Sequence, residues 1–214
     1  MATDNIPPPH SEMPDDTPAD TRGDRRRREL IAAACRLLAD KGFEGLRVRD
    51  VAEGAGVNIA TLHYYFPEKE ALIIGVVEHI LQSFIASNPL HQKVVPHSAV
   101  DQIRAVVANQ EKRIRDNPET YITLTEITSR AHRNSAIQAK LAEMEAGWRA
   151  FLGRLIVAGH ADGSIPSHID PVTTASLLTA VIRGVNIQTV YGLDTPDFPS
   201  IIRAVGRIIG ASED

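Results

Sequence analysis

From about residue 25 onward, apolar residues recur along the chain at the spacing of amphipathic α-helices. In the first such stretch Leu30, Ala34, Leu37 and Leu38 follow one another at i, i+4, i+7 and i+8, which places them on one helix face. Gly42 then supplies a left-handed helix stop. The sequence has no strand-like alternation of useful length and no repeat of fixed period. The pattern therefore predicts an all-α fold.

Polar residues and prolines divide the chain into about nine expected helices. Asn58 is expected to cap the third helix, Ser98 with Asp101 to open the fifth as a capping box, and Asp170 followed by Pro171 to open the eighth. Either residue 134 or residue 135 is expected to cap the seventh. The expected ranges are about 25–42, 48–54, 59–65, 67–86, 98–115, 118–131, 135–159, 171–191 and 197–210.

The formal net charge of −4 conceals an uneven distribution. Residues 1–21 hold five acids and no Lys or Arg, whereas residues 22–69 hold ten Lys or Arg against seven acids. Residues 1–23 are also rich in proline and too poor in apolar residues to fold, so we expect a disordered tail. The basic segment that follows it suits contact with nucleic acid.

The sequence also bears on the compartment. It has no run of about 18 apolar residues that would span a membrane and no signal-peptide pattern at its start. Cys35 is the only cysteine, so no internal disulfide can form. These features predict a cytoplasmic protein.

Residues 25–69 have the spacing of a helix-turn-helix, in which a third helix enters the major groove of DNA. Six apolar residues are expected to face inward: Val48, Val51, Ala52, Val57, Leu62 and Phe66. Six others are then left facing outward: Ile59, Ala60, Thr61, His63, Tyr64 and Tyr65. An exposed run with two tyrosines and a histidine suits contacts to base edges and phosphates better than it suits a merely solvated face.

Residues 25–72 resemble the DNA-binding domain of the tetracycline-repressor (TetR) family. The matching runs are residues 42–45 (GFEG), 48–52 (VRDVA), 55–57 (AGV), 61–66 (TLHYYF) and 67–72 (PEKEAL). The order of the later helices matches as well. The resemblance implies a DNA-binding domain at 24–70, an effector-binding and dimerisation domain at 71–214, and a homodimer bound to a palindromic operator. A small-molecule effector would release the homodimer from the operator. Repressors and activators of the family share the same DNA-binding domain, and we favour a repressor.

The resemblance further implies roles for residues at matching positions. Thr61, Tyr65 and Lys69 are the implied phosphate contacts. The implied contacts in the groove are Ile59, Ala60, His63 and Tyr64. The DNA-binding set also includes Arg47, Asn58 and Arg49, and Arg49 would reach a guanine edge or a phosphate. Arg47 stands where the family usually has a capping Ser or Thr, so it cannot cap the second helix in that way. His63–Tyr64 reverses the family's usual Tyr–His, so the operator sequence does not follow by analogy. The four arginines 25–28 at a helix start oppose the helix dipole and suggest a phosphate-tracking arm.

The helices from 98 to 159 are the expected effector region. The candidate pocket residues are Gln110, Tyr121, Thr125, His132, Met144, Trp148 and Phe151; each alone is as well explained as core, and only the group suggests a pocket. The eighth helix has one charged residue, Arg183, and needs covering on both sides, which suggests a second subunit. The candidate dimer residues are Ala175, Leu178, Ile182, Gly184 and Val185.

Two other functional classes compete with this interpretation. A helical enzyme is disfavoured because the Glu-x-x-His pairs of di-iron sites and the common catalytic and phosphate-binding motifs do not occur. No cofactor or metal is expected. A ligand-binding helical protein without DNA binding is disfavoured by the outward side chains of the third helix.

Overall fold

The computed structural model describes residues 22–91, 98–193 and 197–211, and these residues form nine α-helices and two short 3₁₀ helices, with no strand among them. The α-helices are α1 (Arg22–Gly45), α2 (Val48–Gly54), α3 (Ile59–Tyr65), α4 (Lys69–Ala86), α5 (Ala99–Asp116), α6 (Pro118–Arg130), α7 (Ser135–Asp162), α8 (Pro171–Val190) and α9 (Phe198–Ile208). The 3₁₀ helices η1 (Pro89–His91) and η2 (Ala131–Arg133) follow α4 and α6. The predicted all-α architecture is confirmed. No described helix is long and apolar enough to cross a membrane.

Most of the predicted disordered tail, residues 1–21, lies outside the described residues, and Arg22 and Gly23 already belong to α1. This first helix breaks at Gly42, which has a φ of +69° that residues with a side chain rarely adopt. The predicted stop at Gly42 is therefore confirmed, and a short further turn carries α1 to Gly45.

The predicted N-caps accept hydrogen bonds from backbone N–H groups three residues further on, as N-caps do. The pairs and their donor–acceptor distances are Asn58 with Thr61 (2.8 Å), Ser98 with Asp101 (3.1 Å), Asn134 with Ile137 (2.9 Å) and Asp170 with Thr173 (2.6 Å). Asn134, rather than Ser135, therefore caps α7.

The seventh helix is longer than the sequence suggested. It continues through Gly159 to Asp162 and ends at Gly163, whose φ of +77° is left-handed. Gly159 is no helix stop; it makes room for Ile165, because a Cβ at 159 would lie 2.5 Å from the Cγ1 of Ile165. Packing from the turn that follows therefore explains why position 159 is a glycine, whereas the left-handed Gly163 ends the helix.

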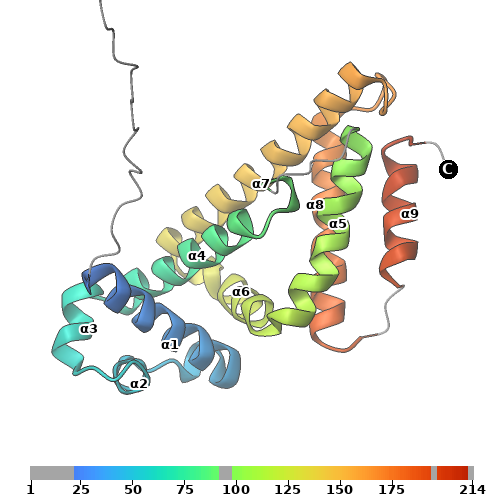
Figure 1. Ribbon diagram of the computed structural model, residues 1–214. Coiled ribbons are helices and arrows are strands. Elements are labelled where there is room, and N and C mark those ends of the chain that lie inside the picture. The colour runs from blue at the N-terminus through green and yellow to red at the C-terminus, as the bar shows by residue number, and fades with distance from the viewer. Residues whose placement is uncertain (1–21, 92–97, 194–196, 212–214) are drawn as a thin grey trace, which may run out of the picture.

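Figure 1 shows how the helices are arranged. The head, which we define as α1–α3, lies at the lower left, and α4 and α7 pack together diagonally across the molecule. The body, α4–α9, has α5 standing against both α8 and α9 at the right. Helix α6 of the body lies next to the head. It packs against α1 on one side and against α5 and α8 on the other. Head and body therefore meet chiefly through α6 and α4.

Two hydrophobic clusters lie inside this arrangement. One is centred on the head but extends into the body, and its fully buried members include Leu30, Leu38, Val51, Leu72 and Ile127. The other fills the rest of the body with Ile103, Leu152, Ile156, Leu178 and Val205, all of them fully buried. Because Ile127 belongs to α6, that helix contributes to the core of the head.

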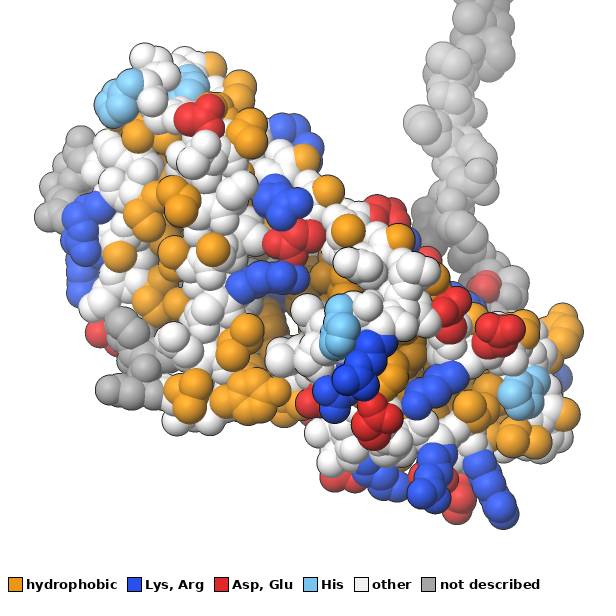
Figure 2. Space-filling view, turned by 180° about the vertical axis from the view of Figure 1, so that it is seen from behind, with side chains coloured by type: hydrophobic (Ala, Val, Ile, Leu, Met, Phe, Trp, Pro, Cys, Tyr) orange, Lys and Arg blue, Asp and Glu red, His pale blue; other side chains and the backbone are white. Residues whose placement is uncertain are grey.

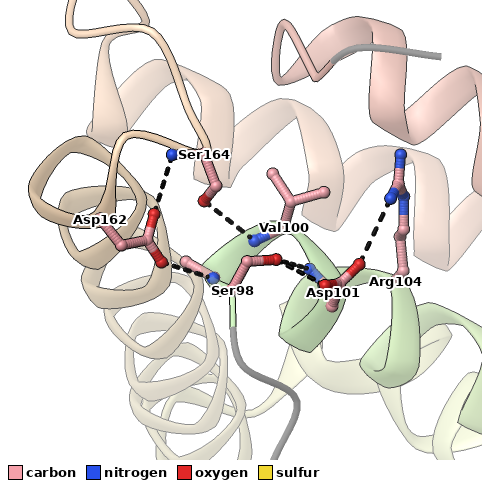
Figure 3. Close-up of polar contacts among 7 residues, drawn as sticks. Ser98, Val100, Asp101, Arg104, Asp162 and Ser164 are labelled. Carbon is pink, nitrogen blue, oxygen red and sulfur yellow. Dashed lines mark hydrogen bonds and ion pairs between the residues drawn. The ribbon is translucent and has the colours of Figure 1, made fainter. Parts of the chain in front are cut away.

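Two side chains from the end of α7 fasten the start of α5 (Figure 3). The Asp162 carboxylate accepts hydrogen bonds from the N–H of Ala99 at 2.8 Å and of Ser164 at 2.9 Å, and the Ser164 hydroxyl accepts one from the N–H of Val100 at 3.4 Å. Ala99 and Val100 carry N–H groups that the first turn of a helix leaves without partners. Hydrogen bonds from the Ser164 side chain, then from the Ala99 N–H, lower the pKa of the Asp162 carboxyl.

Candidate functional site

The third helix presents one side to the core of the head and the other to solvent. Leu62 is buried, whereas Tyr64 is 81% exposed and Ile59 is 48% exposed. Ala60 and His63 are exposed as well. The predicted outward position is confirmed for Ile59, Ala60, His63 and Tyr64, whereas Thr61 and Tyr65 are half-buried.

Asn58 fixes where α3 begins. Its Oδ1 accepts hydrogen bonds from the backbone N–H of Thr61 at 2.8 Å and from the Thr61 hydroxyl at 2.9 Å. The cap satisfies an N–H group that would otherwise lack a partner at the start of the helix. It thereby holds the first turn of α3, which carries Ile59 and Ala60, in one conformation.

Tyr65 lies partly in the core of the head and partly at its surface. It packs against the buried cluster of the head, and its ring meets the Tyr64 ring edge-on, with centroids 5.1 Å apart. At the end of the same helix, His63 Nδ1 lies 3.2 Å from the carbonyl oxygen of Pro67. These contacts restrict how Tyr64 and His63 are presented to a partner.

Lys69 is the first residue of α4, two residues later than predicted, because Glu68 before it is extended. Its Nζ donates a hydrogen bond to the carbonyl oxygen of Phe43 at 3.1 Å and lies 4.9 Å from the centroid of the Phe43 ring. The ammonium therefore ties the start of α4 to the end of α1. This internal role was not foreseen from the sequence.

Arg47 and Arg49 flank the start of α2 and are both exposed. Arg47 occupies the N-cap position without a side-chain hydrogen bond to the helix, which confirms that it does not cap α2. Asp50 forms its ion pair with Lys41, at 3.3 Å, rather than with its neighbour Arg49. Figure 2 shows Lys and Arg side chains projecting from the lower edge of the head.

The arginines predicted as a phosphate-tracking arm belong to the helical part of α1 and have partners within the chain. Arg25 and Arg26 both pair with Glu29, at 3.3 and 2.7 Å. Arg27 pairs with Glu78 of α4 at 3.3 Å, and its guanidinium lies over the Phe66 ring at 5.3 Å. Arg27 therefore contributes to the packing of α1 against α4.

In the body, some of the predicted pocket residues meet. The Tyr121 hydroxyl donates a hydrogen bond to Gln110 Oε1 at 3.0 Å, both residues being buried, and the Thr125 hydroxyl donates to the Tyr121 carbonyl at 2.9 Å. Two residues that were not predicted join them. The Phe84 ring lies 5.6 Å from the Tyr121 ring, and the Arg113 guanidinium lies 3.9 Å from the Phe84 centroid.

Burial dominates the electrostatics of this group. Desolvation lowers the pKa of Arg113, and the neighbouring Tyr121 opposes that shift. Desolvation also raises the pKa of the Tyr121 hydroxyl, against an opposing effect of Arg113. Both shifts reflect the free energy that a charge loses when water is withdrawn from it.

The other predicted pocket residues are dispersed. Trp148 and Phe151 pack together in the body cluster, with ring centroids 5.5 Å apart. Met144 belongs instead to the cluster centred on the head. His132 is exposed in η2, where its Nε2 accepts a hydrogen bond from the neighbouring Arg133 at 3.3 Å. The predicted set is therefore not one site, and His132 and Met144 do not belong with the Tyr121 group.

Three side chains of α6 reach the head. They were not predicted, because their partners are 80 or more residues away in the chain. The Thr123 hydroxyl donates to the Cys35 carbonyl at 3.1 Å, and Glu126 Oε2 accepts from the Phe43 N–H at 3.2 Å. Arg130 pairs with Glu44 at 3.4 Å. Helix α6 thus carries both Tyr121 and the contacts to α1.

The predicted dimer stripe on α8 is corrected by the structure. Ala175, Leu178 and Ile182 are buried within the chain itself, and half-buried Val185 packs against the same body cluster. The outward side of α8 instead exposes Val172 (76%), Leu177 (53%), Ile187 (44%) and Tyr191 (49%), while Gly184 has nothing within 4 Å of where its Cβ would lie. A helix that is apolar on all sides leaves open which face packs inward, and contact with α7 decides it here.

A shallow apolar groove of about 440 Å³ runs beside this outward side. It is lined by Arg149, Ala150, Gly153, Arg154, Val157, Pro171, Val172, Ala175 and Ser176 of α7 and α8. Val157 on its rim is 55% exposed. Figure 2 shows apolar side chains at the surface of the lobe away from the head.

Comparison with known proteins agrees with this geometry. The profile of bacterial regulatory proteins of the tetR family matches residues 30–76, and that of the C-terminal part of BetI-type transcriptional repressors matches residues 99–211. The second match alone covers more than half of the chain.

Individual relatives match over most of their length. The HTH-type transcriptional regulator BetI of Brucella canis is 29% identical over 84% of this chain and 87% of its own. The regulator EthR of Mycolicibacterium smegmatis is 26% identical over 73% of this chain and 70% of its own. A TetR transcription regulator from Haloarcula marismortui shares the fold with a TM-score of 0.75 at 20% identity, over 86% of this chain and 96% of that one. This chain therefore belongs to the TetR family of helix-turn-helix transcriptional regulators.

Proposed function

We propose that this regulator is a repressor that binds a roughly palindromic operator as a homodimer and leaves it when a small molecule binds in the body. In this proposal residues 24–70 form the DNA-binding domain, and residues 71–214 form the effector-binding and dimerisation domain. The chain acts in the cytoplasm, where its operator is. The observation that carries the proposal is the outward face of α3, where Tyr64 is 81% exposed beside a capped helix start.

The proposed DNA contacts fall into two groups. Side chains at the exposed centre of α3, Ile59, Ala60, His63 and Tyr64, face the floor of the major groove and read bases. Thr61, Tyr65, Arg47 and Arg49 bind phosphates around it, with Asn58 at the helix start. Lys69 adds positive charge near the backbone of DNA while it remains bonded to the Phe43 carbonyl. The cap and the Tyr64–Tyr65 contact support this assignment because they hold the reading face in one shape before DNA arrives.

The proposed dimer uses the outward side of α8 and the adjacent groove. Val172, Leu177, Ile187 and Tyr191 would otherwise leave a band of apolar surface in water. Contiguous exposed apolar surface of this kind marks interaction sites in proteins. A two-fold axis through α8 joins the same patch on both copies and presents two heads to two half-sites.

The proposed switch passes through α6 and α4. A ligand that contacts Tyr121 touches α6, and α6 holds α1 through Thr123 and Glu126. Helix α4 is tied to α1 through Lys69. A ligand that prefers a different conformation of the body therefore changes the position of the heads. Operator affinity can fall at most by the ratio of the ligand's affinities for the ligand-preferred and the DNA-binding conformations.

Selection of bound sequences from random duplex DNA, at a stated salt concentration, tests the proposed function. We expect a palindromic consensus with the wild-type protein. Tyr64→Ala should lower affinity for that consensus about tenfold and relax its sequence preference, whereas Gln138→Ala, at an exposed position on α7, should change neither. If no palindrome is enriched, the chain is a ligand-binding helical protein without operator recognition, and the proposal fails.

A further inference from the structure

Among the described residues, the half-buried guanidinium of Arg113 in the body has no carboxylate partner. Arg113 on α5 places its guanidinium 3.9 Å from the centroid of the Phe84 ring, and its Nη2 is buried without a hydrogen-bond partner. Within residues 22–91, 98–193 and 197–211, no carboxylate lies within ion-pair distance of it. Arg115, on the same helix, has both Glu111 and Asp116 within 4 Å although it is exposed.

The surroundings of Arg113 are aromatic. Phe84 and Tyr121 lie with their ring centroids 5.6 Å apart, and the Tyr121 hydroxyl donates a hydrogen bond to Gln110 at 3.0 Å. Tyr121 and Gln110 are both buried. Burial lowers the pKa of Arg113, which is the sign of a charged form deprived of solvent.

A partly buried cation without a counter-ion costs a protein free energy, and an apolar residue of similar volume would pack there without that cost. The contact with the Phe84 ring recovers only part of the cost. Groups of this kind, which local packing does not require, are expected at functional sites. The group that would complete this site is a negatively charged ligand that pairs with Arg113.

We propose that the effector is a small organic monocarboxylate with an apolar body, and that Arg113 binds its carboxylate. This inference rests on the effector site assigned above to the body. The planar guanidinium offers a carboxylate two parallel N–H donors, the Phe84 and Tyr121 rings cover the apolar part of the ligand, and the unpaired Nη2 gains its partner.

The same geometry disfavours a positively charged ligand. Cations are bound in aromatic sites by the face of a ring, and the guanidinium of Arg113 already occupies the face of Phe84. A second positive charge in this group would be repelled. A single cation also matches one negative charge rather than the two of a phosphate monoester.

The test measures melting temperature and Trp148 fluorescence of the full-length protein with a series of alkanoates from butyrate to decanoate, with benzoate and phenylacetate, with the corresponding neutral amides, and with choline. We expect at least one carboxylate to raise the melting temperature while its amide and choline do not. Arg113→Lys keeps the positive charge but loses the paired N–H donors of the guanidinium. It should lower the affinity for that carboxylate about tenfold. If no carboxylate acts more strongly than its amide, or if choline acts as strongly, the proposal is overturned.

Arg113→Met separates a ligand-binding role from a structural one. We expect it to raise the melting temperature of the ligand-free protein, because it removes a half-buried cation whose Nη2 lacks a partner, and to abolish the carboxylate effect. Arg115→Met, the matched control on the surface of α5, should leave the carboxylate effect intact. A lower ligand-free melting temperature for Arg113→Met, or an unchanged carboxylate effect, overturns the proposal.

Operator binding is measured in parallel without any ligand. Wild type and Arg115→Met should bind the selected operator with equal affinity, since Arg115 is exposed on α5 and lies outside the proposed effector site. An operator that is bound while every carboxylate fails overturns only the effector class. Carboxylate binding that depends on Arg113 without any operator overturns the proposed repressor function and leaves the ligand assignment standing.

Discussion

The carboxylate of Glu126 accepts a hydrogen bond from the backbone N–H of Phe43, at 3.2 Å, across 83 residues of sequence. The same Oε2 atom lies 3.1 Å from where a Cβ at position 42 would be, so Gly42 serves both the left-handed break in α1 and the approach of α6. One body residue is thereby fastened to the joint between the first two helices of the head.

Glu126→Ala should lower the free energy of unfolding by about 1–2 kcal/mol, because the Phe43 N–H loses a charged acceptor. It should also reduce the effect of ligand on operator affinity, since one of the contacts between α6 and α1 is gone. Denaturant unfolding and ligand-dependent operator binding measure the two effects. Glu126→Gln keeps an acceptor and should restore most of both, and Thr128→Ala, exposed on the same helix, should alter neither. Full ligand response in Glu126→Ala would remove α6 from the proposed switch.

Asn58→Ala should cost about 1 kcal/mol of stability through loss of the α3 cap, and it should weaken operator binding because the reading face is no longer held in shape. Asn58→Ser preserves a capping oxygen and should behave nearly as the wild type does. Chemical denaturation and gel-shift titration give the two quantities. Equal operator affinity for Asn58→Ala and wild type would show that the cap does not preorganise α3.

Leu177→Asp should convert the proposed dimer into a monomer, because it places a charge in the middle of the outward side of α8, where Leu177 is 53% exposed. Its folding should be little affected, since the side chain is not part of the core. Light scattering coupled to gel filtration reports the mass. Gln138→Asp is the control, and a dimer that survives Leu177→Asp would place the interface elsewhere.

Cys35 should be nearly inert in the folded protein. Burial raises the pKa of its thiol to about 11 from 9.0, with Arg36 opposing the shift. At pH 8 the thiolate fraction is then about 100-fold lower than in an exposed cysteine, and labelling with a disulfide reagent should slow accordingly. Because the folded state holds the proton more tightly than the unfolded state, this contribution to stability is complete below pH 9 and is lost as the pH rises towards 11. Rapid labelling of the folded, ligand-free protein at pH 8 would contradict the burial of Cys35 beside α6.

Two glycines of α7 should respond to alanine in opposite ways. Gly159→Ala should destabilise the fold by about 2 kcal/mol, because its Cβ would lie within 3 Å of three atoms of Ile165. Gly147→Ala, in the same helix with nothing within 4 Å, should stabilise it by about 0.5–1 kcal/mol. Thermal unfolding of the two variants side by side provides the comparison, and a neutral Gly159→Ala would show that the turn carrying Ile165 shifts freely.

The parts of the fold that the sequence predicted are those decided by neighbouring residues. The helix starts at Asn58, Ser98 and Asp170 follow from caps three residues from their donors, and the outward face of α3 follows from the spacing of Leu62 and Phe66. The features that were not predicted depend on contacts between segments that are distant in the sequence.

Three examples show the limit. Whether Ala175 or Leu177 faces inward on α8 depends on α7, since the helix is apolar on both sides. The position of the Arg113 guanidinium depends on Phe84, which comes from another helix. The need for glycine at position 159 depends on Ile165 in the turn after α7. In each case the role of the residue depends on a contact with another segment, which the sequence pattern alone does not predict.

Asn134 uses both ends of its amide. Its Oδ1 accepts the N–H of Ile137 to cap α7, while its Nδ2 donates to the carboxylate of Glu70 in the first turn of α4. Aspartate would keep the cap but oppose Glu70 with a second negative charge, and serine is too short to supply the donor as well. A single side chain thus couples the cap of α7 to the first turn of α4: Asn134→Asp would leave α7 capped and remove this polar contact, while the apolar packing of α7 against α4 would remain.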